Sequence, residues 1–140
     1  MRSPNAARAA LIFLVLAAAS VGIPAALAPH AFYNDFPFLA HWVDRIPPYN
    51  EHLVTDVGGL YLGFTVIFAW AAWRLEPTLV RAVCAGWLLT EALHLGFHAT
   101  HLDNFDTADA IGQLVSLAIL LIPPPVAIWA VGRPGRVSAP

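Results

Sequence analysis

Residues 54–73 read VTDVGGLYLGFTVIFAWAAW, and this stretch decides what kind of fold the chain adopts. Asp56 is its only charged residue. A helix of about 20 predominantly apolar residues crosses the roughly 30 Å of hydrocarbon in a bilayer. The stretch therefore predicts a transmembrane helix, and it raises the question of what Asp56 meets inside the membrane.

Three further apolar stretches predict three more spans, at about 9–28, 79–100 and 110–131. The chain of 140 residues is 59% hydrophobic and only 11% charged, whereas an average soluble domain carries about a quarter charged residues. We therefore expect one all-α transmembrane domain, 1–140. Its architecture would be an integral membrane four-helix bundle with an outer loop at 29–50.

The first stretch has a second interpretation. Arg2 and Arg8 precede it, and Ala26-Leu27-Ala28 resembles the cleavage site of a secretory signal. We favour a membrane span, because the apolar run is long and Pro29 would directly follow the cut.

The arginines predict the orientation. An even number of spans places six of the seven on one side, which the positive-inside rule makes cytoplasmic. The amino and carboxyl termini would then both be cytoplasmic, in a plasma (inner) membrane. The six are Arg2, Arg8, Arg74, Arg81, Arg133 and Arg136, and Arg45 lies on the other side.

Composition also excludes several classes of protein. The single cysteine, Cys84, excludes an internal disulfide and a multi-cysteine zinc site. The chain has no lysine and no basic tract, so we expect no nucleic-acid partner. The lipid bilayer is the expected partner, and a homo-oligomer or a larger membrane complex is compatible with a bundle of this size.

Residues 91–103, EALHLGFHATHLD, concentrate titratable groups at the end of the third span. A helical wheel places four of them within an arc of about 80°. Such a stripe is unfavourable against lipid, so it should face the bundle interior or a wet cavity. The four are Glu91, His94, His98 and His101, and Cys84 and Trp87 continue the stripe.

The second span carries polar residues that should face this stripe. A short turn at Glu76-Pro77 makes the two spans antiparallel neighbours, and residues equally far from the turn lie at equal depth. This places Asp56 between His94 and His98. By the same count His52 lies beside His98 and His101, and Tyr61 lies level with Glu91. Gly59 and Gly63 share the face of His52 and Asp56 and form a small-xxx-small pair, which lets membrane helices approach closely.

The fourth span supplies further polar residues that should approach the stripe from a third side. Counted back through the outer turn, Gln113 comes next to His98 and Ser116 comes level with His94. Pro123-Pro124-Pro125 removes three backbone donors and must break the helix. Such a break is tolerated where neighbours satisfy the freed carbonyls.

This arrangement predicts a transition-metal site of zinc, iron or copper. Histidines four apart on one helix chelate one ion, and a carboxylate completes many such sites. The expected ligands are His94, His98 and Asp56, with His52 and His101 close by. Glu91 would act as the catalytic acid or base, and Gln113, Ser116 and Tyr61 would line the cofactor site.

The leading hypothesis is thus a metal-binding membrane protein, an oxidoreductase or hydrolase acting on a lipid-soluble substrate. A non-catalytic accessory subunit of a membrane complex is one alternative. A metal-free proton-transfer isomerase and a haem b electron carrier are two others. The outer loop, rich in aromatic residues, is either an interfacial belt or a lid that brings His30 and His41 to the site.

Two resemblances accompany these motifs. PYNEHLVTDVGGLYLGF (48–64) followed by HLGFHATHLD (94–103) resembles small four-span bacterial membrane proteins of unknown function, loosely grouped as DoxX-like. That resemblance covers about 47–122 and implies four packed helices. His52, Asp56 and Glu91 are similar to the acid and histidine arrangement of emopamil-binding-type sterol isomerases, which implies proton transfer. The additional histidines at 94, 98 and 101 depart from that pattern.

Overall fold

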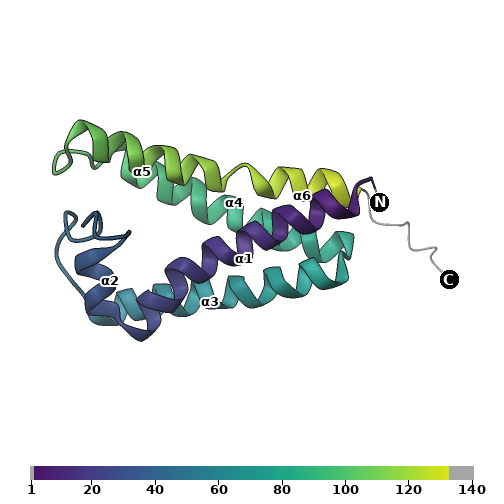
Figure 1. Cartoon of the computed structure of the whole chain (residues 1–140), viewed down its shortest axis with the longest axis horizontal. Coiled ribbons are helices and arrows are strands. Elements are labelled where there is room, and N and C mark those ends of the chain that lie inside the picture. Colours follow the sequence, from purple (N-terminus) through teal and green to yellow (C-terminus); the bar gives the residue numbers. More distant parts are fainter. Residues whose placement is uncertain (1, 133–140) are drawn as a thin grey trace.

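The computed structural model describes residues 2–132 as an elongated bundle of helices (Figure 1). Arg133 and Arg136, which contribute to the predicted charge asymmetry, lie outside the described residues. A short helix also occupies the start of the predicted outer loop. The elements are α1 (Pro4–Leu27), α2 (Pro29–Asp35), α3 (Glu51–Arg74), α4 (Pro77–Ala99), α5 (Thr107–Leu120) and α6 (Pro123–Val131).

Four helical stretches are long and apolar enough to cross a membrane: α1, α3, α4, and α5 with α6 taken together. Their outward faces carry large apolar side chains, such as Leu60 and Leu93, each 68% exposed. In water such a surface would be unfavourable, whereas lipid tails accommodate it. The all-α bundle that the sequence predicts is therefore found, with each span beginning a few residues before the predicted start and ending within one residue of the predicted end.

Polar caps fix where three of the helices begin. The side chain of Asn50 accepts a hydrogen bond from Leu53 N, and that of Asp106 accepts one from Asp109 N. Glu76 is a cap that the sequence analysis missed: its carboxylate accepts from Thr78 N at 2.9 Å and from Leu79 N at 2.7 Å. These bonds satisfy amide groups that have no partner within the helix.

The triple proline divides the fourth span as predicted. α5 ends at Leu120, and α6 begins at Pro123. The indole Nε1 of Trp87 on α4 donates to the carbonyl of Leu120 at 3.3 Å. A neighbouring helix thus satisfies a carbonyl that the break leaves without its helical donor.

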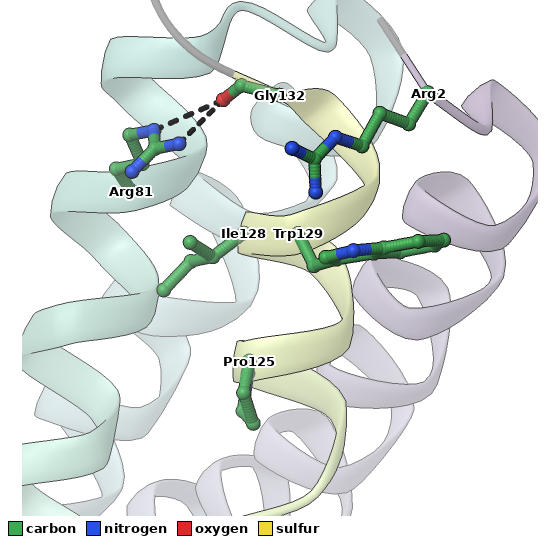
Figure 2. Close-up of a pocket in the computed structure, with 6 residues that line it drawn as sticks. All are labelled: Arg2, Arg81, Pro125, Ile128, Trp129 and Gly132. Atoms are coloured by element: carbon green, nitrogen blue, oxygen red, sulfur yellow. Dashed lines mark hydrogen bonds between the residues drawn. The ribbon is translucent and has the colours of Figure 1, made fainter.

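The first and last described residues lie at the same end of the bundle, which we call the arginine end (Figure 1). The backbone N–H groups of Arg2 and Ser3 both donate to the carbonyl of Ala130. The guanidinium of Arg81 donates to the carbonyl of Gly132 (Figure 2). The opposite end holds α2 and residues 36–50, and we call it the loop end (Figure 1).

Glycines bring α1 and α3 into direct backbone contact near the loop end. A Cβ added to Gly58 would lie 2.7 Å from the carbonyl carbon of Ala25, and one added to Gly22 would lie 2.9 Å from Leu62 N. By contrast, a Cβ at Gly59 or Gly63 would meet nothing within 4 Å. The sequence prediction that Gly59 and Gly63 form the close helix contact is therefore wrong. Gly58 makes the contact instead, with α1 rather than α4.

Aromatic side chains fill the core between α3 and α4. Trp87 is fully buried, and its ring meets those of Tyr61, Phe64 and Phe68 at centroid distances of 5.6, 5.3 and 5.3 Å. The rings meet edge to face, which is a favoured aromatic geometry. The inner part of the predicted stripe, Cys84 and Trp87, therefore faces the interior as expected.

Gly58→Ala should destabilise the protein by about 1–3 kcal/mol, because its methyl group would push two helix backbones apart. Gly59→Ala is the matched control. It should be neutral or slightly stabilising, since alanine favours a helix over glycine. Thermal unfolding of both variants in one detergent measures the difference. Equal stability of the two variants would contradict the close contact at Gly58.

Glu76 predicts a pH-dependent stability. The backbone N–H groups of Thr78 and Leu79 stabilise its carboxylate and lower its pKa below the ordinary 4.5. A lowered folded-state pKa gives stabilisation that is present above the ordinary value and is lost as pH falls through the folded value. Glu76→Gln should therefore lower the Tm near neutral pH, and the difference should shrink on acidification below 4.5.

Asp103→Asn, in the turn before α5, is the control for this experiment. It should not reproduce the pH-dependent difference. A Tm difference for Glu76→Gln that stays constant with pH would show that the carboxylate cap is not its source.

Candidate functional site

A cavity of 670 Å³ lies at the loop end, and we call it the loop-end cavity. Its volume falls within the range of small-molecule binding sites. α1, α3, α4 and α5 form its walls, and apolar side chains dominate them. The polar lining residues are Ser20, Tyr61, His94, His98, Gln113 and Ser116.

The predicted outer loop covers this cavity. Phe32, Phe36 and Trp42 line it. Trp42 donates from its indole to Asp109 at 3.0 Å, and Arg45 pairs with the same carboxylate at 3.1 Å. These bonds attach the loop to the start of α5, so this segment lies over the site as a lid would.

The two loop histidines do not take part in the cavity wall. His30 is hydrogen-bonded to the side chain of Asn34, and His41 to the carbonyl of the same residue. Neither lines the loop-end cavity. The expectation that they approach the polar site as further ligands is not met in this conformation.

A buried carboxylate, Glu91, lies behind the polar wall of the loop-end cavity. Glu91 is fully buried, and its Oε1 accepts a hydrogen bond from the Tyr61 hydroxyl at 2.9 Å. Its Oε2 has no hydrogen-bond partner, although His94 Nδ1 lies 3.7 Å away. The predicted equal depth of Tyr61 and Glu91 is confirmed by this bond. An acid in such surroundings is a candidate proton carrier.

Two imidazoles continue this polar group toward α5. The rings of His94 and His98 lie 4.8 Å apart between centroids. His98 Nδ1 is hydrogen-bonded to Oε1 of Gln113, as the sequence predicted for these two residues. Tyr61, Glu91, His94, His98 and Gln113 thus form a polar row from α3 across α4 to α5. We call it the polar row.

His52 and Asp56 do not join the polar row. They lie on the outer surface of α3, where their side chains are 82% and 57% exposed, and they pair with each other at 3.3 Å. The prediction that Asp56 faces His94 and His98 is therefore wrong, because its side chain points in another direction around the axis of α3. Counting residues from a turn gives depth alone, and the Gly58 contact turns this face of α3 away from α4.

His101 is also separate from the polar row. α4 ends at Ala99, so a helical wheel no longer gives its direction. Its ring stacks on Phe97 at 4.0 Å on the exposed surface. Ser116 does line the loop-end cavity, and its hydroxyl donates to the carbonyl of Gly112.

The predicted metal set does not assemble in this conformation. In residues 2–132, no three or more His, Cys, Asp or Glu side chains are grouped so that they could hold a metal ion. The expected ligands fall into two separate pairs, His94 with His98 and His52 with Asp56, and His98 Nδ1 is already engaged by Gln113. The residues therefore do not fit the predicted metal, and no chemical step is derived through it.

A second, smaller cavity of 330 Å³ lies at the arginine end. Figure 2 shows Arg81 directed at the Gly132 carbonyl, with Arg2 near the Trp129 ring. None of the described residues in its wall carries a carboxylate or an imidazole. The loop-end cavity is therefore the better candidate site.

Sequence reasoning missed the residues that hold the loop in place. Trp42, Arg45 and Asp109 come from distant parts of the chain. The sequence offered one signal: the predicted orientation puts Arg45 on the opposite side of the membrane from the other arginines, and an isolated charge in so apolar a protein requires a partner. Comparison with family models, curated proteins and solved structures gives no match to this chain.

Tyr61→Phe should destabilise the protein by about 1–3 kcal/mol, because both oxygens of the buried Glu91 would then lack a hydrogen-bond donor. Asp56→Asn removes a pair that is exposed and should change stability by less than about 1 kcal/mol. Thermal unfolding in one detergent compares the two. A larger effect at Asp56 than at Tyr61 would contradict the placement of these side chains.

Proposed function

We propose that this protein binds a lipid-soluble molecule in the loop-end cavity and exchanges a proton with it through Glu91. The observation that carries the proposal is the pairing of a large apolar cavity with a buried carboxylate directly behind its polar wall. Pockets that are mostly apolar with a few convergent polar groups are typical of small-molecule sites.

The apolar walls support a lipid-soluble ligand. Within the described part of the chain, no Lys, Arg, Asp or Glu lines the cavity. Aromatic and aliphatic side chains from the loop, α1 and α3 would enclose the body of such a molecule. Its polar group would then lie against Tyr61, His94 and His98.

Two contacts of Glu91 support proton exchange. The Tyr61 hydroxyl bonds one carboxylate oxygen, and His94 Nδ1 lies 3.7 Å from the other. Both Tyr61 and His94 also line the cavity. An imidazole accepts a proton at one ring nitrogen and releases it from the other, so His94 would connect a bound ligand to Glu91. The 3.7 Å separation would have to shorten, as catalytic hydrogen bonds often do when a ligand binds.

The proposed orientation of the bundle in the membrane follows from the positions of the arginines. The arginine end would face the cytoplasm under the positive-inside rule, with the protein in the plasma membrane. The loop-end cavity would then lie in the outer half of the bilayer. A lipid-soluble ligand would be drawn from that leaflet or from the compartment outside it.

The proposal predicts that a lipid-soluble molecule co-purifies with the protein. Leu117→Trp should fill the cavity, since Leu117 lines it, and should reduce the amount of bound molecule several-fold. Leu89→Trp is the matched control, because Leu89 is 65% exposed on α4 and should face lipid. Mass spectrometry of organic extracts from equal amounts of folded protein measures the result.

Equal extracts from both tryptophan variants and the wild type would overturn the binding proposal. Elemental analysis of the same preparations, made without chelator, tests the alternative. Stoichiometric zinc, iron or copper that depends on His94 would favour the metal-binding hypothesis over metal-free proton exchange. A protein with neither ligand nor metal would favour the accessory-subunit hypothesis.

A further inference from the structure

Gln113 is the most informative residue that the proposed function leaves unused. It is 2% exposed, and among residues 2–132 its amide Nε2 has no hydrogen-bond partner. A buried donor without a partner is costly, by about 1–3 kcal/mol. Because Gln113 lines the loop-end cavity, a bound molecule is the natural source of the missing acceptor.

The other bond of Gln113 fixes the protonation of His98. An amide oxygen only accepts hydrogen bonds. His98 Nδ1, which is bonded to that oxygen, must therefore carry the hydrogen. The described residues give His98 no carboxylate partner, and apolar surroundings penalise an unpaired charge. In the neutral ring, Nε2 is then an acceptor.

The remaining polar groups of the wall also present acceptors. The hydroxyl of Ser116 donates to the Gly112 carbonyl, and that of Tyr61 donates to Glu91. Their oxygens keep only lone pairs for a ligand. Of Gln113, His98, Ser116 and Tyr61, only Gln113 thus keeps a donor without an acceptor, and the Ser116 oxygen is an acceptor one helical turn away on α5.

We propose, resting on the function above, that the ligand is an uncharged lipid with a free hydroxyl group, an alcohol or a phenol. A hydroxyl can accept from Gln113 Nε2 and donate to the lone pairs of the Ser116 oxygen, one helical turn away on α5. A carboxylate or phosphate only accepts, and none of the described residues that line the cavity is cationic and able to pair with it. An ammonium only donates, and a ketone or ester has no hydrogen to donate to the acceptors of the wall.

The test is a competition assay on the full chain in detergent. Tritiated 1-hexadecanol is the probe, and the competitors are 1-hexadecanol, hexadecyl methyl ether, palmitic acid and hexadecylamine. One net hydrogen bond corresponds to roughly a tenfold difference in affinity. Unlabelled hexadecanol should therefore compete roughly tenfold better than the other three molecules.

Gln113→Leu is the matched variant. It removes the donor but keeps an apolar side chain of similar size, so hexadecanol and its methyl ether should then compete almost equally. Leu89→Trp should keep the wild-type preference. If Gln113→Leu fails to fold, the ranking of the four competitors on the wild type still decides the proposal.

The two proposals fail in different ways. Binding of palmitic acid or hexadecylamine as tight as that of hexadecanol, or no binding of any probe, would overturn the hydroxyl assignment. The proposed function would survive either result if the wild type still co-purifies a molecule that Leu117→Trp loses. Equal co-purification by Leu117→Trp and wild type would remove both.

Discussion

The backbone contact between Gly58 on α3 and the Ala25–Ala26 segment of α1 is the constraint on which the rest of the structure depends. It fixes how α3 is rotated about its own axis. With Gly58 against α1, Tyr61 and Phe68 point into the bundle and are buried. His52 and Asp56 consequently face outward. A different rotation would bring a different set of polar groups toward α4.

The buried carboxylate of Glu91 depends on that rotation. It is tolerated inside an apolar bundle because Tyr61 donates to one oxygen and His94 stands near the other. Burial of an acid is otherwise unfavourable, so the two neighbours are required for its position. His98 and Gln113 extend the polar row to α5, and the cavity adjoins the row where the loop covers it. Apart from Ser20 on α1, the polar side chains that the proposed ligand would meet thus lie at one wall.

The cover of the cavity rests on polar contacts between distant segments. Arg45 and Trp42 share the carboxylate of Asp109, at 3.1 and 3.0 Å. Asn104 also donates to the carbonyl of Arg45 at 2.7 Å. A half-exposed arrangement of this kind is more easily opened than the aromatic core around Trp87. The loop is therefore the part of the fold through which a ligand would enter with least disruption.

The sequence by itself determined the all-α class, the four stretches long and apolar enough to cross a membrane, and the break at Pro123–Pro125. These follow from length, apolar content and backbone chemistry, which act along the chain. It also placed Tyr61 beside Glu91 and His98 beside Gln113, because equal distance from a short turn fixes equal depth. Only the tertiary structure decided which way each face turned, since rotation about a helix axis depends on how all the helices pack together. Gly58 rather than Gly59 entered the contact with α1, and that single choice separated Asp56 from the histidines.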